Sequence, residues 1–380
     1  MSFTSSSVPS RARYIMIGGF LGAGKTTAVA RLAQRLHERG LRVGLITNDQ
    51  GSELVDTATL AARGFPVEEI AGGCFCCRFS SLVEAAQKLS AQTRPDVFIA
   101  EPVGSCTDLV ATVTYPLRRI YGENFSIAPL SVLVDPIRAL RVFGLAEGGR
   151  FSDKVIYIYR KQLEEADVIV INKADLLTSA QAESLRRALA SAHPGAELLL
   201  ASARHGTGLD EWFQRITSTE QTAERAMSVD YDLYADGEAL LGWLNATVEL
   251  SAATPVDGND LLTALAGAVQ QRLAHRGAEI AHFKMTLDPR NGFGDLGVIN
   301  LVRNDFVPEL SQKLADPLER GQIVVNLRAE AAPEVLRAAL DEGLAACAAG
   351  TPGLTLDLQH VEQFRPGRPQ PTHRMTSPNV

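Results

Sequence analysis

One run of residues near the start of the chain constrains the fold more than any other, namely Gly-Phe-Leu-Gly-Ala-Gly-Lys-Thr at positions 19–26. It matches the pattern G-x-x-x-x-G-K-[ST], whose backbone N–H groups wrap around a phosphate. An apolar stretch at 14–17 precedes it, and residues 25–39 place apolar side chains at helical spacing. Phosphate binding needs a strand that passes through glycines into a helix, because the helix N-terminus faces the anion. The pattern therefore predicts a P-loop nucleotide-binding fold rather than a glycine-rich turn that serves packing alone.

The residues of this loop have separate expected tasks. We expect Lys25 to reach the β- and γ-phosphates, Thr26 to ligate Mg²⁺ and Thr27 to donate to the α-phosphate. The glycines allow the backbone to come close to the β-phosphate. The predicted phosphate-contacting residues are Gly22, Ala23, Gly24, Lys25, Thr26 and Thr27.

Apolar runs alternate with helical segments over roughly the first half of the chain. This alternation is typical of an α/β fold with a mostly parallel sheet that helices cover on both faces. The expected helices include 80–92 and 179–192. The expected strands after the first are 41–47, 97–100, 130–134, 168–171 and 198–200.

The second half of the chain has a different order of expected strands and helices. Its apolar runs follow the order β-α-β-β-(β)-α-β, which predicts a smaller α+β domain of ferredoxin-like plan. A polar, acidic segment separates the two halves and is typical of a linker. The expected organisation is a flexible tail at 1–12, the P-loop domain at 13–220, a linker at 221–236, the α+β domain at 237–363 and an extended tail at 364–380.

Composition excludes several classes of protein. Lys and Arg number 37 against 44 Asp and Glu, a net charge of −7 that argues against a nucleic-acid scaffold. No apolar run is long enough to cross a bilayer, and the polar residues 1–10 lack the apolar centre of a signal peptide. The five cysteines do not form the even set of a disulfide framework. We expect a cytoplasmic protein with no nucleic-acid or membrane partner.

A second motif points to the base of the nucleotide. The apolar run 166–171 leads into Asn172-Lys173-Ala174-Asp175. A carboxylate at Asp175 can accept hydrogen bonds from guanine N1–H and the 2-amino group, a donor pair that adenine lacks. Asn172 would brace the loop, and the Lys173 stem would cover the flat base. Ser202 and Ala203, after a later strand, are the expected second base-contacting loop. We predict GTP, and the alternative is a surface turn in which Asp175 caps a helix.

Two acidic residues are candidates for the magnesium site. Glu101 follows the apolar run 97–100 and precedes Gly104, a position from which a P-loop protein holds Mg²⁺ and contacts the γ-phosphate. Asp49 follows strand 41–47, and an Asx-turn there is as well supported as a metal contact. The predicted magnesium set is Thr26, Asp49 and Glu101, and the predicted catalytic set is Lys25, Thr26 and Glu101.

Three cysteines are concentrated in one short loop. Cys74, Cys76 and Cys77 follow two glycines, and thiolates at this spacing can converge on Zn²⁺ or Cu(I). Three ligands leave a fourth tetrahedral position open, which indicates an exchangeable site rather than a structural one. Small buried hydrophobes and a redox pair are the alternatives. Cys106 and Cys347 are isolated in the sequence, and we expect them in the core.

Taken together, the phosphate loop with Thr27, the Gly73-Cys74-Phe75-Cys76-Cys77 run, Glu101-x-x-Gly104 and the motif at 172–175 resemble the CobW-like P-loop GTPases over about 13–215. The resemblance implies slow GTP hydrolysis coupled to binding and delivery of a metal, zinc or in some branches cobalt. It also implies a client metalloenzyme or cofactor-assembly pathway and a homodimer as a candidate assembly. Carried over to this chain, Cys74, Cys76 and Cys77 would be the metal ligands.

Three functions remain under comparison. The first is a GTP-hydrolysing metallochaperone in which nucleotide and metal bias one conformational equilibrium. The second is a zinc or thiol-redox sensor that uses GTP as a conformational brace. The third is a P-loop small-molecule kinase, which accounts for neither the cysteines nor the motif at 172–175.

Overall fold

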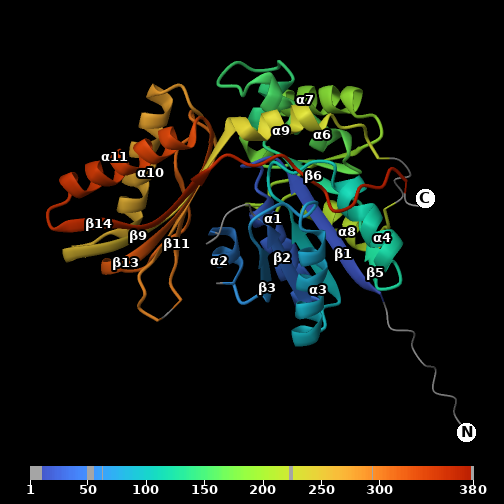
Figure 1. Ribbon diagram of the computed structural model, residues 1–380, viewed down its shortest axis with the longest axis horizontal. Coiled ribbons are helices and arrows are strands. Elements are labelled where there is room, and N and C mark those ends of the chain that lie inside the picture. The colour runs from blue at the N-terminus through green and yellow to red at the C-terminus, as the bar shows by residue number, and fades with distance from the viewer. Residues whose placement is uncertain (1–10, 49–54, 62, 222–225, 293, 378–380) are drawn as a thin grey trace, which may run out of the picture.

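The computed structural model describes residues 11–48, 55–61, 63–221, 226–292 and 294–377, and these residues form two sheets with their helices (Figure 1). The first sheet has eight strands in the order β3-β2-β4-β1-β6-β7-β8, with β5 paired to β1. The paired strands of this sheet run parallel. The strands are β1 Ala12–Gly19, β2 Val43–Asn48, β3 Val67–Ile70, β4 Val97–Glu101, β5 Phe125–Ile127, β6 Ser131–Val134, β7 Val168–Ile171 and β8 Glu197–Leu200.

Helices cover both faces of the first sheet. The helical elements are α1 Lys25–Glu38, α2 Val55–Ala61, α3 Phe79–Thr93, η1 Val110–Thr114, α4 Tyr115–Tyr121, α5 Pro136–Val142, α6 Asp153–Glu164, η2 Ala174–Leu176, α7 Ser179–Ala192 and α8 Leu209–Ser218. Tyr14 and Met16 of β1 pack with α3 and α6, whereas Ile15 and Ile17 pack with α1 and α8 on the opposite face. Apolar side chains on both sides of a strand are what a parallel sheet between two helical layers needs. The predicted α/β P-loop fold is confirmed.

The second sheet has six strands in the order β12-β11-β10-β13-β9-β14, and its paired strands are antiparallel. Without β12, the chain order of strands and helices is the β-α-β-β-(β)-α-β order expected from the sequence. The β11–β12 pair extends the sheet at one edge. The elements are β9 Leu241–Val256, α10 Gly258–His275, β10 Glu279–Asp288, β11 Gly297–Leu301, β12 Glu309–Gln312, β13 Leu318–Glu330, α11 Pro333–Gly350 and β14 Leu354–Phe364.

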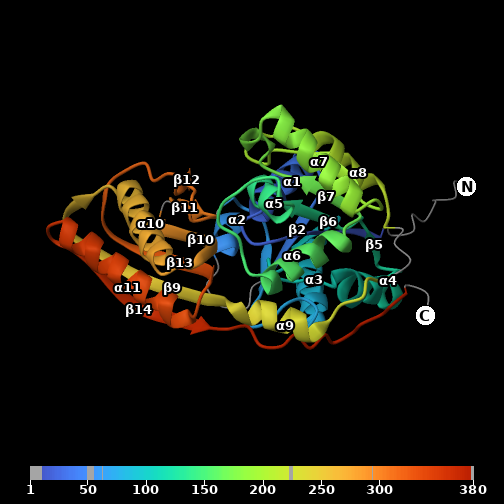
Figure 2. The same cartoon turned by 90° about the horizontal axis from the view of Figure 1, so that it is seen from above.

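The two faces of the second sheet differ in polarity. Alternate residues such as Leu244 and Phe283 form an apolar core with α10 and α11. The residues between them, including Asn245, His282 and Asn326, are polar and also buried. Helices α10 and α11 lie on the side of this sheet away from the first domain, and α2 lies on the other side (Figure 1, Figure 2). The polar face is therefore turned toward the P-loop domain.

The segment expected to be a linker contains part of a helix, α9 Tyr231–Leu240. Asp230 caps this helix, because its side chain accepts from the backbone N–H groups of Asp232 and Leu233. Tyr234 is fully buried, so the helix has an inward face despite its acidic composition. Part of the predicted linker is thus a packed element of the P-loop domain.

The tail after β14 has no helix or strand among residues 365–377, and it runs back across the molecule to the first domain (Figure 2). Thr372 N–H donates to the carbonyl of Cys76, and Met375 N–H donates to the carbonyl of Ala111. The extended tail is therefore attached to the P-loop domain. None of the helices in the part of the chain that the structure describes is long and apolar enough to span a membrane.

Candidate functional site

The phosphate loop connects β1 to α1. Gly22 and Gly24 have φ angles of 80° and 91°, in the left-handed region that favours glycine. A Cβ on Gly24 would lie 2.5 Å from Nδ2 of Asn172. Lys25 is the first residue of α1 and donates to the carbonyl of Gly19 at 2.9 Å. Burial lowers the pKa of Lys25. Loop and helix together have the geometry that the pattern predicts for an N-terminal anion site.

Thr26 lies among charged groups from three segments. Its Oγ1 lies 2.8 Å from Oδ1 of Asp56 and 3.0 Å from Oε1 of Glu101. Lys284, on β10 of the second domain, donates to both oxygens of Asp56 at 2.6 and 2.8 Å. Burial favours a higher pKa for Asp56, but Lys284 outweighs it and lowers that pKa. The structure therefore brings a lysine of the second domain to the phosphate loop.

Glu101 is the residue whose environment best fits a cation. Burial raises its pKa to about 7, and the neighbouring Asp56 adds to the rise. Its Oε2 is buried and has no hydrogen-bond partner among the described residues. Mg²⁺ prefers oxygen ligands, so Thr26 and Glu101 suit it in type and in position. Asp49 lies outside the described residues, and Asp56, which the sequence analysis did not single out, is the second carboxylate beside Thr26.

The predicted guanine loop lies directly against the phosphate loop. Asn172 is buried, donates to the carbonyl of Ala23 at 2.8 Å and accepts from Ala203 N–H at 2.9 Å. It thereby ties the two expected base-contacting loops to the phosphate loop, which is the bracing role predicted for it. Lys173 has a φ of 54° and donates to the carbonyl of Gly22 at 2.7 Å.

Asp175 is more accessible than Asn172. Its carboxylate is 3.7 Å from Nε2 of His205, with 31% of the side chain exposed. It lines the same cavity as Thr27, which is exposed at the start of α1. Ser202 is buried and accepts from His205 N–H. Asp175 therefore keeps a carboxylate available to a ligand in the cavity.

Most of these residues line one cavity of 460 Å³ between the two domains, whereas Gly19, Ala23, Ser202 and His205 do not. Its size lies within the range of small-molecule sites, roughly 300–1,000 Å³. The P-loop domain contributes Lys25, Glu101 and Asp175, and the second domain contributes His282 and Lys284. The pKa of His282 is lowered well below its usual range by burial and by nearby cations, Lys284 first among them. A ligand in this cavity would touch both domains.

Asp135, the cap of α5, joins the domains next to this cavity. It accepts from Lys173 at 2.9 Å and from Arg303 of the second domain, also at 2.9 Å. Burial opposes its ionisation, but Lys173 and Arg303 lower its pKa below the ordinary value. Arg138 donates from α5 to the carbonyl of Val302 in the second domain at 2.6 Å. The loop at 172–175 and the second domain thus both donate hydrogen bonds to one buried carboxylate, that of Asp135.

The three clustered cysteines converge as predicted. The Sγ atoms of Cys74, Cys76 and Cys77 lie within 4.8 Å of one another. Cys74 Sγ is 2.8 Å from that of Cys76 and 3.4 Å from that of Cys77. The loop directly precedes α3, and hydrogen bonding with Cys74 raises the pKa of Cys76 well above its usual range and that of Cys77 to about 11. The arrangement suits a soft divalent cation.

Asn48, the last residue of β2, holds this cysteine loop. Its Nδ2 donates to the carbonyls of Ile70 at 2.9 Å and Gly73 at 2.7 Å. Its Oδ1 accepts from Phe75 N–H at 2.9 Å. Asn48 itself lines the nucleotide cavity. One buried side chain therefore connects the cavity to the cysteine loop.

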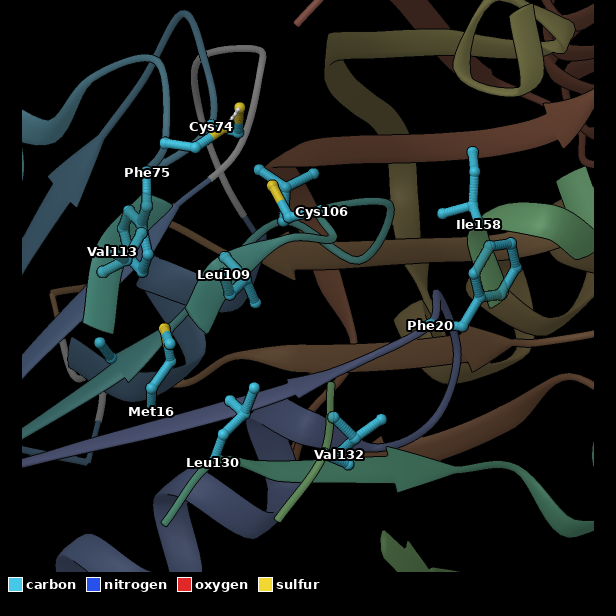
Figure 3. Close-up of a cluster of buried hydrophobic side chains, with 14 of the residues drawn as sticks. Met16, Phe20, Cys74, Phe75, Cys106, Leu109, Val113, Leu130, Val132 and Ile158 are labelled. Atoms are coloured by element: carbon cyan, nitrogen blue, oxygen red, sulfur yellow. Dashed lines mark hydrogen bonds between the residues drawn. The ribbon is translucent and has the colours of Figure 1, made fainter. Parts of the chain in front are cut away.

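Cys106 lies in the buried core, as expected, although the fold brings this residue, isolated in the sequence, close to the cysteine loop. The chain folds so that its thiol approaches Cys74, and hydrogen bonds from Cys106, Cys76 and Cys77 lower the pKa of Cys74 well below its usual range. Figure 3 shows the sulfur of Cys106 turned toward Cys74. Sequence spacing concealed this contact, because it is made between two different loops. Cys347 lies in the apolar core of the second domain, as expected.

The C-terminal tail covers the outer side of the cysteine loop. Gln370 N–H donates to Sγ of Cys77 at 3.2 Å, and Thr372 Oγ1 donates to the carbonyl of Cys77 at 3.1 Å. The ring of His373 meets that of Phe79 edge to face, with centroids 5.0 Å apart. Access to the thiols from this side therefore requires the tail to move.

Three residues at the cavity were not predicted from the sequence, namely Asp56, His282 and Lys284. Asp56 lies in no recognisable motif. A signal did exist for the other two, because His282 and Lys284 alternate with apolar residues along a strand whose apolar face packs on helices. Polar residues at that period on a buried face indicate that another domain covers them.

Comparison with known proteins places the first domain. Residues 13–199 match the family described as CobW/HypB/UreG, nucleotide-binding domain. The zinc chaperone CobW of Sinorhizobium sp is 28% identical over 203 residues, which cover 46% of this chain and 54% of that protein. The zinc chaperone YeiR of Escherichia coli is 30% identical over 175 residues, covering 45% and 49%. The match thus spans about half the length of these relatives.

A third relative and one solved structure extend the comparison. The zinc-regulated GTPase metalloprotein activator 1 of Dictyostelium discoideum is 26% identical over 214 residues, covering 48% of this chain and 44% of that protein. The crystal structure of Zn(II)-bound YjiA GTPase from E. coli covers 87% of this chain and 98% of its own, at 16% identity and a TM-score of 0.38. The assignment of the first domain therefore depends on the family match and the sheet topology.

Proposed function

We propose that this chain, which belongs to the CobW/HypB/UreG family through its residues 13–199, hydrolyses GTP and couples its nucleotide state to the delivery of a transition metal. The observation that carries the proposal is the position of Asn48. It lines the nucleotide cavity and, at the same time, fixes the loop that presents Cys74, Cys76 and Cys77. A change at the nucleotide can therefore reach the thiols through a single residue.

GTP is the proposed nucleotide because of the loop at 172–175. Asn172 fixes this loop on the phosphate loop, and Asp175 faces the cavity as the acceptor for guanine N1–H and its 2-amino group. Adenine offers no such donor pair, so its binding would leave a carboxylate unpaired.

Hydrolysis transfers the γ-phosphoryl group to water: the water oxygen bonds to phosphorus, the bond to the bridging oxygen breaks, and GDP and phosphate leave. Lys25 orients and neutralises the phosphate oxygens, with Thr26 and Glu101 as the proposed Mg²⁺ ligands. The bound Mg²⁺ would offset charge on the β- and γ-phosphates. Lys284 adds a cation from the second domain, so phosphate binding also bears on the contact between the domains.

The metal is the cargo of this system. Three thiolates favour zinc, which the names of the curated relatives also carry, and cobalt is a second ion that such a site accepts. The recipient would be a client metalloprotein or a cofactor-assembly enzyme. A homodimer stays part of the proposal, because the resemblance to the CobW-like GTPases implies one as a candidate assembly.

The test is zinc affinity, measured by competition with a chromophoric chelator in three states: nucleotide-free, with GDP, and with a non-hydrolysable GTP analogue plus Mg²⁺. We expect a difference of at least about tenfold between the two nucleotides, which corresponds to ~1.4 kcal/mol of coupling. The variant Cys74→Ser/Cys76→Ser/Cys77→Ser should lose zinc binding and keep nucleotide binding.

Two other results would point to the other functions. Equal zinc affinity in all three states would contradict the chaperone and favour a zinc or thiol-redox sensor. Transfer of the γ-phosphoryl group to a small molecule, in place of release as inorganic phosphate, would favour a kinase.

A further inference from the structure

We propose that Cys106 is a fourth metal-binding thiol, which completes a four-sulfur site with Cys74, Cys76 and Cys77 and is carried by the loop that senses the nucleotide. This inference rests on the proposed function and adds a ligand and a coupling route to it. It replaces the open three-cysteine site of the sequence analysis with one that can close.

The contact between Cys106 and the cysteine loop is the first argument. Cys106 and Cys74 belong to one buried core cluster, each residue is at most 4% exposed, and Cys106 is the first of the groups that lower the pKa of Cys74. In Figure 3 the sulfur of Cys106 is turned toward Cys74, which lies on a different loop of the same buried core as Phe75 and Leu109. Cys74 thus has three thiol neighbours, since Cys76 and Cys77 also contact it. A cation that replaces the thiol protons would be shared among these sulfurs.

The place of Cys106 in the chain is the second argument. The residue follows the segment from Glu101, the proposed magnesium ligand at the end of β4, through Gly104. Gly104 packs directly on the phosphate loop, because a Cβ there would lie 2.6 Å from Cδ2 and 3.0 Å from the backbone nitrogen of Leu21. One short segment therefore begins at the nucleotide cavity and ends at the thiols.

Side chains of α6 and α9 hold this segment. Gln162 Nε2 donates to the carbonyls of Gly104 at 2.9 Å and Cys106 at 2.8 Å. Ser105 Oγ donates to Oε1 of Glu238 at 2.6 Å. Because α9 continues into β9, a shift of the segment is also communicated to the second domain. The segment that carries Cys106 is thus held by α6 of the first domain and by α9, which leads into the second domain.

The chemistry of zinc is the third argument. Zn²⁺ takes four ligands in tetrahedral geometry, and a site of four cysteines is closed to solvent ligands. The Sγ atoms of Cys74, Cys76 and Cys77 already lie within 4.8 Å of one another, while Cys106 lies beside Cys74, outside this set (Figure 3). A modest movement of its loop would bring Cys106 into the ligand set or out of it. Each thiol that binds releases its proton to solvent. Zinc would then have four thiolates in one nucleotide state and three in the other.

The experiment uses Co²⁺ as a spectroscopic probe on the full chain, without nucleotide and with each nucleotide in turn. In the nucleotide state of highest intensity, Cys106→Ser should lower the sulfur-to-cobalt charge-transfer absorption by about a quarter, since one of four thiolates is lost. Cys347→Ser, a buried cysteine of the second domain, is the matched control and should leave the band unchanged. Cys106→Ala provides a second substitution at the same site, and binding of a fluorescent GTP analogue shows that each variant is folded.

Zinc affinity supplies the second readout. We expect Cys106→Ser to weaken zinc binding by at least about tenfold in the tighter nucleotide state. The ratio between the two nucleotide states should then approach one. Full absorption and unchanged affinity in both Cys106 variants would overturn the fourth ligand but leave the chaperone function intact. If wild-type affinity does not depend on the nucleotide, the proposed function itself fails.

Discussion

Asn48 offers a sharp test of how the nucleotide cavity and the cysteine loop are joined. The variant Asn48→Ala removes three hydrogen bonds, of which those to Ile70 and Phe75 are buried and the one to Gly73 is partly buried. Because the carbonyl of Ile70 and the N–H of Phe75 belong to buried residues, we expect the free energy of unfolding to fall by about 2–4 kcal/mol. The cysteine loop would lose its fixed conformation, and re-ordering even one residue on metal binding costs about 1–2 kcal/mol. Zinc affinity should therefore fall by about tenfold or more.

The assay combines urea unfolding with chelator competition for zinc, both on the full chain. Asn259→Ala is the matched control, because Asn259 makes two hydrogen bonds with the backbone of Leu314 in the second domain. It should lose stability and keep its zinc affinity. If Asn48→Ala binds zinc as tightly as wild type while its stability falls, Asn48 supports the fold alone and the reasoning is refuted.

Three further predictions concern the domain contact, the tail and pH. Lys284→Met removes the cation that is paired with Asp56, so binding of a fluorescent GTP analogue with Mg²⁺ should weaken by about tenfold. Unchanged affinity would contradict a role for the second domain in nucleotide binding. Removal of residues 366–380 uncovers Cys77, so zinc should pass to a chelator several-fold faster with no change in nucleotide affinity; an unchanged rate would show that the tail does not limit access. Burial raises the pKa of Glu165 well above its ordinary value, so its contribution to stability is present at acidic pH and is lost as pH rises toward the folded pKa. In the variant Glu165→Gln, stability should therefore decline less with rising pH. The measurement is thermal unfolding between pH 5 and pH 8, about the range where such groups titrate. A pH profile identical to that of the wild type would contradict this assignment.

Local sequence predicted the phosphate loop and the cysteine loop well, because each is a continuous run whose glycines and spacing define its shape. The strands around them were predictable for the same reason, since buried parallel strands are short apolar runs. The helix at 179–192 coincides with α7. Its Thr178 and Gln181 form a capping box, a signal that is itself local.

Contacts between distant segments could not be predicted in this way. Cys106 reaches Cys74 only because the β4 loop and the cysteine loop meet above the sheet. An ion pair with Lys284 of the other domain helps to hold Asp56 next to Thr26. Part of the predicted linker is a helix, which the burial of Tyr234 stabilises. The acidic composition of the segment does not indicate that burial. Tertiary packing decided each of these cases.

The most direct test of the coupling uses its reciprocity, because a nucleotide that changes zinc affinity must have its own affinity changed by zinc by the same factor. The measurement is the affinity of the full chain for a fluorescent non-hydrolysable GTP analogue with Mg²⁺, in metal-free and zinc-loaded protein. We predict a difference of at least about tenfold, equal to the ratio of zinc affinities between the nucleotide-free and analogue-bound states. Equal affinities in the two preparations would contradict the proposal that nucleotide and metal share one conformational equilibrium.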